Sequence, residues 1–169
     1  MHINDIIFVK EMRRMEVVMA ETQFVIFKLN DEEYGVNIKQ VQEICSYQKA
    51  TFVPNSPEFI QGIINLRNVV IPVINLKDRF RITNSDVVDE NTRMIVMNIS
   101  KGQFGFVVDD ASEVISIDEN NIEETPEMLM GDGRRYISGI GKVGDRLLVL
   151  LDMEQLLNEE EKGQIKSIK

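Results

Sequence analysis

FVIFKLNDEEYGVNIKQVQEICSY, residues 24–47, decides the fold, because a later stretch of the chain repeats its pattern. The later stretch, MIVMNISKGQFGFVVDDASEVISI at residues 94–117, aligns on it without gaps, 70 positions further on. The apolar positions match almost throughout, and three aligned pairs are identical: Gly35/Gly105, Glu43/Glu113 and Ser46/Ser116. Self-similarity at a fixed offset is typical of repeated structural units, so we interpret the two stretches as copies of one unit.

A second pair of stretches extends the duplication. Residues 59–80 align without gaps on residues 136–157, 77 positions later, and the identical pairs are Ile60/Ile137, Gly62/Gly139 and Ile63/Ile140. The two blocks follow in the same order, which predicts two related modules, at residues 19–90 and 91–158; the family resemblance described below implies that strands can be exchanged between them. Residues 159–169 are expected to form the end of a C-terminal helix and a tail.

Each module has the pattern of short β-strands joined by tight turns. The predicted strands are 24–29, 34–38, 43–47, 60–66 and 69–74 in the first module, and 94–99, 104–108, 114–117, 136–143 and 146–151 in the second. Turns are predicted at residues 30–33, 67–68, 101–102 and 144–145. Pro72 lies inside a strand pattern and predicts a sheet edge at that point. Strands this short and numerous predict an all-β protein made of small closed barrels.

Helix is expected only at short turns near residues 38–41 and 57–59 and at the C-terminus. Asp152 is a good N-cap residue with Gln155 three positions later, and the apolar side of the helix would carry Met153, Leu156 and Leu157. We therefore predict a C-terminal helix that begins at Asp152.

The first eighteen residues are expected to be a disordered tail outside the fold. Met12, Met15 and Met19 cluster before the first strand, among residues that purine-rich codons resembling a ribosome-binding site can encode. We hypothesise that Met19 is the natural start and that the tail is a translated upstream region. The alternative is an amphipathic tail helix.

Composition limits the classes of partner. The net charge of −9 and the pI near 4.7 disfavour a nucleic-acid partner, because phosphate backbones repel an acidic surface. The longest apolar runs, such as residues 147–151, are far shorter than the roughly 20 residues that span a bilayer. Cys45 is the single cysteine, so no intrachain disulfide is possible, and we expect a cytoplasmic protein without direct membrane insertion.

The residues that catalysis usually requires are scarce. His2 is the only histidine and lies in the predicted tail, so neither a nucleophilic triad nor a zinc site is expected, and Cys45 is expected to be an inert packed thiol. The acidic residues at 118–124 lack the spacing of a calcium loop. Glycines 139, 141 and 144 match G-x-G-x-x-G, but a strand follows where a dinucleotide site needs a helix. We expect no cofactor and no metal.

One catalytic alternative stays open. Asp109 and Asp110 end a predicted strand, and a hydrolase that depends on carboxylates would need such a pair. Paired acids at strand ends are more often solvated turn residues. The sequence makes no positive case for an enzyme.

Several spaced motifs resemble the CheW family of chemotaxis coupling proteins, in the order in which that family has them. They are VPxxPxFIxGIxNLRNVVIPVIxL at residues 53–76, EYGV at 33–36, VQEI at 41–44, GFVVD at 105–109 with EV at 113–114, and SGIG at 138–141 running to Asp152. The resemblance covers residue 22 to about residue 158. One departure is Asn68, where the family usually has Gly; Asn tolerates the same backbone region, so we expect the turn to survive.

The resemblance implies a fold and a function. The fold would be two SH3-like five-stranded barrels related by the internal duplication and packed on a shared core, with a short C-terminal helix. The protein would be a non-catalytic adaptor that binds the cytoplasmic helical tip of methyl-accepting chemoreceptors and the CheW-like regulatory domain of the histidine kinase CheA. It would be recruited to receptor arrays at the inner membrane. Rival interpretations are a scaffold that serves another two-component kinase, the carboxylate-dependent hydrolase and, against the charge, a nucleic-acid-binding barrel.

The receptor-binding residues implied by the resemblance or favoured by their chemistry are Val41, Glu43, Ile44, Gly62, Arg67 and Asn68. Arg67 is a charge at a hairpin tip, and Glu43 is expected to pair with it and orient its guanidinium. Val41 and Ile44 are interpreted equally well as the lining of an apolar groove for a helix and as core residues. Gly62, like Gly139, is expected at a strand position with close backbone approach or a bulge. The kinase-binding residues stay unassigned.

Overall fold

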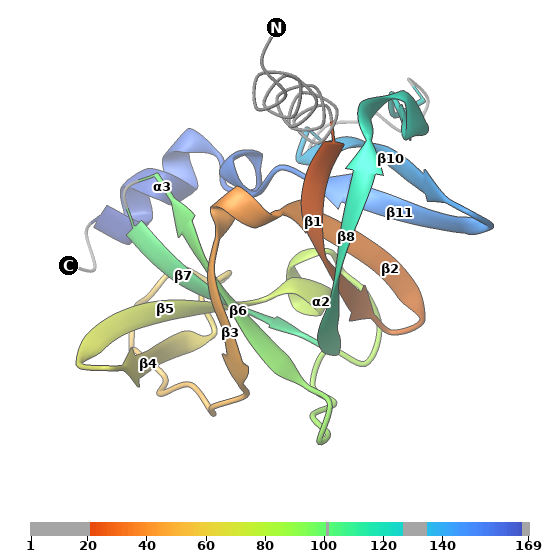
Figure 1. The fold of residues 1–169 in the computed structure, drawn as a ribbon. Helices are drawn as coiled ribbons and strands as arrows, with labels where there is room; N and C mark the ends of the chain where they lie inside the picture. The colour runs from red at the N-terminus through yellow and green to blue at the C-terminus, as the bar shows by residue number, and fades with distance from the viewer. Residues whose placement is uncertain (1–20, 101, 127–134, 167–169) are drawn as a thin grey trace, which may run out of the picture.

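In the computed structural model of the protein, residues 21–100, 102–126 and 135–166 are described, and they form two β-sheets with little helix (Figure 1). The first sheet has the strand order β8-β1-β2-β11-β10-β9 and the second β3-β6-β7-β5-β4. The predicted all-β fold is confirmed. The second sheet has five strands, and the first has six because the two-residue β9 pairs with β10.

Every predicted strand overlaps an observed one, and the largest difference is β8, which has nine residues where residues 114–117 were predicted. In the first half they are β1 Glu21–Leu29, β2 Glu32–Asn37, β3 Val41–Ser46, β4 Gly62–Leu66 and β5 Val69–Asn75. In the second half they are β6 Arg93–Ile99, β7 Gly102–Val108, β8 Asp110–Asp118, β9 Ile122–Glu123, β10 Ile137–Val143 and β11 Arg146–Leu151. Short 3-10 helices, η1 Ile38–Gln40 and η2 Glu119–Asn121, follow β2 and β8. The β1–β2 turn is shorter than predicted, because Glu32 and Glu33 already pair with Leu29 and Lys28.

The two halves exchange strands. The hairpin β1–β2 of the first half pairs with β8 and β11 of the second half, and the hairpin β6–β7 of the second half pairs with β3 and β5 of the first. The last long strand of each half pairs in parallel: β11 pairs with β2, and β5 pairs with β7. Each sheet is therefore built from both halves of the chain, and the boundaries of the sequence modules do not coincide with the sheets.

Three groups of buried side chains follow from this arrangement. The largest, which we call the shared core, draws residues from both sheets, among them Val25, Phe27, Ile95, Met97 and Phe106. A smaller group inside the first sheet includes Ile26 and Leu148, and another inside the second includes Val96 and Ile71. Neighbouring residues on one strand alternate between the shared core and an inner core, because successive side chains of a strand point to opposite faces.

A β-bulge occurs at the same place in both halves. On β3 the pairing with β6 shifts between Val41 and Glu43, and on β8 the pairing with β1 skips one residue between Ala111 and Glu113. These positions are 70 residues apart, the offset of the sequence repeat. Conservation of such a local irregularity between the halves supports the duplication at the level of the backbone.

Pro72 lies where β5 lacks a second neighbour. Pro72 pairs with Ile63 of β4, but the pairing of β5 with β7 begins only at Val73. A proline has no amide hydrogen to donate to a ladder, which fits this position. The predicted local edge is confirmed, although β5 lies inside the sheet as a whole.

The C-terminal helix begins later than predicted. Asp152 does act as a cap, but it accepts a hydrogen bond from the Glu154 amide and starts only the 3-10 helix η4, Met153–Gln155. The helix α3, Glu159–Lys166, has its own start, because Asn158 and Glu161 exchange hydrogen bonds as a capping box. The prediction of one helix from Asp152 is therefore wrong. The predictions for residues 1–18 lie outside the described residues.

Candidate partner-binding site

The β4–β5 hairpin ends in a tight turn that projects a cation. Both turn residues, Arg67 and Asn68, have positive φ, 51° and 67°. Two successive left-handed residues are the signature of a type I′ turn, whose twist matches that of the flanking strands. Asn68 takes the left-handed backbone as predicted, and Arg67, the other residue of the turn, takes it as well.

Arg67 is paired but largely exposed. Its Nη1 donates to Oε1 of Glu43 on β3 at 2.8 Å, while 77% of the Arg67 side chain is open to solvent. Among the described residues, only Glu43 accepts a hydrogen bond from this guanidinium. The predicted pair is thus formed, and it orients Arg67 while other N–H groups of the guanidinium point to solvent.

The corresponding glutamate of the second half is bound very differently. Glu113 accepts two hydrogen bonds from Arg146 on β11, at 3.1 and 2.8 Å, and Arg146 also donates two to Glu33 on β2. These hydrogen bonds lower the pKa of Glu33 and of Glu113, against the opposing effect of burial, and they raise the pKa of Arg146. The Arg146 clamp, as we call this triad, ties β11 to β2 and β8.

Val41 and Ile44 lie on the same side of β3. Val41 pairs with Met97 and Ile44 with Ile95, and both partners belong to the shared core. The bulge between them is the reason, since without it residues three apart would face opposite sides. Val41 is half-buried against the shared core, whereas Ile44 is 38% exposed. Of the two sequence interpretations, core packing therefore applies to Val41, and exposure on an apolar surface applies to Ile44, which lies at the border of the shared core.

Sequence reasoning missed the equivalent residue of the second half. Val114 is 70 positions after Ile44, pairs with the core residue Val25 and is 51% exposed. Both β3 and β8 are outer strands of their sheets, and β6 contacts both of them (Figure 1). Each outer strand therefore shows one apolar side chain to solvent beside the shared core. The signal that would have found Val114 is the repeat offset itself.

Gly62 is required by a close backbone approach. A Cβ atom there would lie 2.4 Å from the carbonyl oxygen of Thr51, which pairs with Ile63. At Gly139 a Cβ atom would lie 2.9 Å from the Ile122 side chain and 3.0 Å from the Glu123 carbonyl oxygen. The prediction of close approach holds at both equivalent glycines. Gly62 thus fixes the position of β4, the first strand of the hairpin that carries Arg67.

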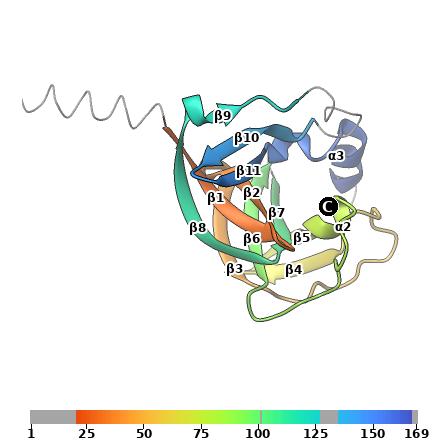
Figure 2. The same ribbon diagram turned by 90° about the vertical axis from the view of Figure 1, so that its right-hand side faces the viewer.

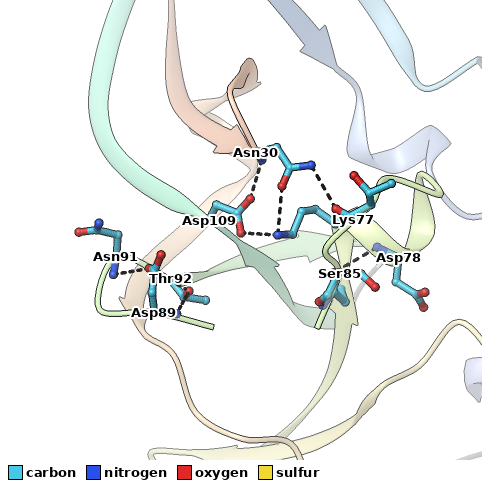
Figure 3. A network of polar contacts seen from close by, with 10 residues as sticks. Asn30, Lys77, Asp78, Ser85, Asp89, Asn91, Thr92 and Asp109 are labelled. Carbon is cyan, nitrogen blue, oxygen red and sulfur yellow. Dashed lines mark hydrogen bonds and ion pairs between the residues drawn. The ribbon is translucent and has the colours of Figure 1, made fainter. Parts of the chain in front are cut away.

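Asp109, the first candidate for carboxylate catalysis, is part of a structural network (Figure 3). Its Oδ1 lies 2.8 Å from Nζ of the buried Lys77, and its Oδ2 accepts the Asn30 amide at 2.5 Å. Asn30 also donates to the Thr83 carbonyl oxygen. The carboxylate thereby ties the β1–β2 turn to α2, the short helix Leu76–Arg79 that follows β5. An acid held by a buried lysine and a backbone amide is poorly placed to act as a base, so the geometry does not favour the hydrolase.

The remaining motifs find structural explanations. Residues 139–144 form a strand and a tight turn with Gly144 at φ 59°, so the glycine pattern does not open a helix. Burial raises the pKa of the Cys45 thiol, which packs against the inner core of the second sheet. The part of the chain that the structure describes contains no group of three or more His, Cys, Asp or Glu side chains placed to hold a metal ion. None of its helices is long and apolar enough to cross a membrane.

Comparison with known proteins agrees with this arrangement. The model of the CheW-like domain family matches residues 23–161. The chemotaxis protein CheW of Klebsiella aerogenes is 40% identical over 146 residues, which cover 86% of this chain and 87% of that protein. The CheW protein of Bacillus subtilis is 37% identical over 138 residues, 82% of this chain and 88% of that protein.

A solved structure shows the same fold. The crystal structure of the scaffolding protein TtCheW from Thermoanaerobacter tengcongensis matches with a TM-score of 0.75 at 37% identity, covering 83% of this chain and 95% of that one. The family model, the relatives and the fold all agree with the motifs of the sequence. The chain belongs to the CheW family.

Proposed function

We propose that this protein is a chemotaxis adaptor that couples transmembrane chemoreceptors to the histidine kinase CheA by protein–protein binding, without catalysis. In this role it is cytoplasmic and is recruited to receptor arrays at the inner membrane. The observation that carries the proposal is the state of Arg67, a cation fixed at a hairpin tip by one carboxylate and otherwise open to a partner.

The apolar residues beside the shared core support a helical partner. The receptor tip expected for this family is a helical hairpin, and helices dock by placing an apolar stripe on an apolar surface. Ile44 and Val114 offer exposed apolar side chains, and Val41, on the same side of β3 as Ile44, packs against the shared core. Glu43 holds Arg67, and Gly62 and Asn68 shape the hairpin, so each of the six receptor-binding candidates has a physical role in the proposal.

The kinase is proposed as the second partner, through its CheW-like regulatory domain. A two-sheet scaffold with outer strands on both sheets has more than one surface to offer. A binding survey against several two-component kinases separates this proposal from a CheW-like scaffold that serves another kinase. Strong binding to another kinase and none to CheA would favour the second.

The central test is Arg67→Ala and Arg67→Glu, with Lys49→Ala as a control that removes an exposed cation elsewhere. Co-purification with a receptor signalling tip and with CheA, each presented separately, is the measurement. We expect the receptor tip to bind at least roughly tenfold more weakly to the Arg67 variants, as for the loss of a charge-assisted contact, with unfolding unchanged. Normal assembly of receptor and kinase by Arg67→Glu would refute the role of Arg67.

A further inference from the structure

Arg79, the last residue of α2, makes an unusually complete set of contacts. Its Nη1 and Nη2 donate to the two carboxylate oxygens of Glu161 on α3, both at 2.8 Å, and Nη2 also donates to the Leu156 carbonyl oxygen at 2.9 Å. The guanidinium carbon lies 5.8 Å from the centre of the Phe59 ring. A bidentate pair stacked on an aromatic ring fixes both the position and the plane of the guanidinium.

One partner of Arg79, Phe59, lies at the base of the β4–β5 hairpin. Phe59 precedes β4, and the ladder of the hairpin continues toward it through the hydrogen bond from the Gln61 amide to the Val73 carbonyl oxygen. At the other strand, α2 follows β5 directly and is capped by Asn75. The contact of Arg79 with Phe59 therefore closes the hairpin at the end opposite to Arg67, roughly 17 Å away at the usual rise of a strand.

The helix α3 is joined to α2 through the same residue. Glu161 accepts from Arg79, and it also closes the capping box with Asn158 that starts the helix, so one carboxylate serves both purposes. Glu159 and Glu160 on the same turn are exposed. Apolar anchoring comes from the residues before the helix, Leu156 and Leu157, which belong to the shared core.

We propose that α3 is a strap that fixes the base of the β4–β5 hairpin through the Glu161–Arg79 pair and so positions Arg67 for its partner. Arg79 and Glu161 are positioning residues in this scheme and do not touch the partner. The proposal rests on the proposed function at one point only, namely that Arg67 binds a chemoreceptor. The mechanical part, from α3 to the hairpin, concerns the isolated protein.

Hydrogen exchange followed by mass spectrometry on the full chain tests the strap. Glu161→Gln removes the charge from the pair, Arg79→Lys removes its two-pronged geometry, and Glu160→Gln is the matched control on the same turn. We expect exchange in α3 to accelerate roughly tenfold in the first two variants, and exchange in residues 62–75 by a smaller factor of roughly three, with β1–β2 unchanged. Glu160→Gln should resemble the parent protein.

Three outcomes would overturn the proposal: unchanged exchange in residues 62–75, an equal effect of Glu160→Gln, or an equal acceleration in β1–β2, which would indicate general destabilisation. A second measurement, the affinity for a receptor tip, should fall severalfold in Glu161→Gln while the melting temperature stays within about 2 °C. If the parent protein does not bind the tip at all, the proposed function fails, whereas the exchange result still decides whether the strap exists.

Discussion

The two halves of the molecule place a glutamate at the same point of an outer strand, yet they use it for different purposes. Glu113 is held with Glu33 by the Arg146 clamp, whose arginine makes four hydrogen bonds and is 36% exposed. Glu43 has a single hydrogen bond from Arg67, which is 77% exposed. One copy of the duplicated glutamate is therefore part of a structural clamp, while the other pairs with an exposed arginine from a different position of its own half, since the offset of 77 relates Arg67 to Gly144.

The same divergence appears at the turns of the first hairpins. Asn30 and Ser100, which the offset of 70 relates, both have positive φ, and each contacts a residue two or three positions after the last long strand of its half. In the first half that residue is Lys77, which is buried and bound to Asp109; in the second it is Glu154, which accepts from Ser100 at the surface. Both halves keep a contact between these positions, but the charged residue is a lysine in the first half and a glutamate in the second.

The largest effect on stability is expected at the two equivalent glycines, where Gly62→Ala and Gly139→Ala should differ. Gly62→Ala should destabilise the protein by about 2–3 kcal/mol, since its Cβ would meet the backbone of Thr51, and Gly139→Ala by about 1 kcal/mol, since the Ile122 side chain can move aside. Urea unfolding measures both. Equal losses would show that the close approach at Gly62 relaxes easily.

The next test sets the two arginines against each other. Arg146→Ala should cost about 1–2 kcal/mol of unfolding free energy, a value reduced for solvent screening, because it frees two carboxylates. Arg67→Ala should cost less than about 0.5 kcal/mol, as expected for an exposed pair. A stability loss in Arg67→Ala as large as that in Arg146→Ala would contradict the division of roles.

The contribution of the Arg146 clamp to stability should depend on pH. The pKa values of Glu33 and Glu113 are lowered from the ordinary 4.5, so their contribution to stability is present above about pH 4.5 and is lost as the pH falls through the lowered values. The difference in stability between the parent and Arg146→Ala should therefore shrink on acidification below pH 4.5. Chemical unfolding from pH 7 to pH 3 measures it, and a difference that does not change with pH would argue against the clamp.

The smallest expected effect on stability belongs to Ile44→Ser and Val114→Ser. Both side chains are substantially exposed, so each change should alter the unfolding free energy by roughly 0.5 kcal/mol or less. Receptor-tip binding should weaken in both variants if the helix meets both outer strands. Weakening in Ile44→Ser alone would restrict the binding surface to β3, and far-UV circular dichroism controls for folding.

Much of the fold could be predicted because its signals are local. Alternation of apolar residues located the strands, and Asn68 and Gly144 marked two turns at the correct residues. The C-terminal helix was misplaced because two caps follow one another, and Asp152 satisfies only a single 3-10 turn before Asn158 starts again. The choice between caps depends on which residues the core buries, here Leu156 and Leu157, and the sequence does not show that.

The sequence by itself determined the duplication, the all-β fold, the family and the pair of Glu43 with Arg67. The tertiary structure was needed to show that the halves exchange strands, which Figure 2 shows from the side. It was also needed to show that β3 and β8 carry the same bulge and that Ile44 and Val114 are exposed to solvent beside one core. The physical reason is the range of the interactions. Turn conformation and strand alternation depend on neighbours along the chain. Exposure and the partners of an arginine depend on strands further away in the sequence, 24 residues for Arg67 with Glu43 and 33 for Arg146 with Glu113, which meet only on folding.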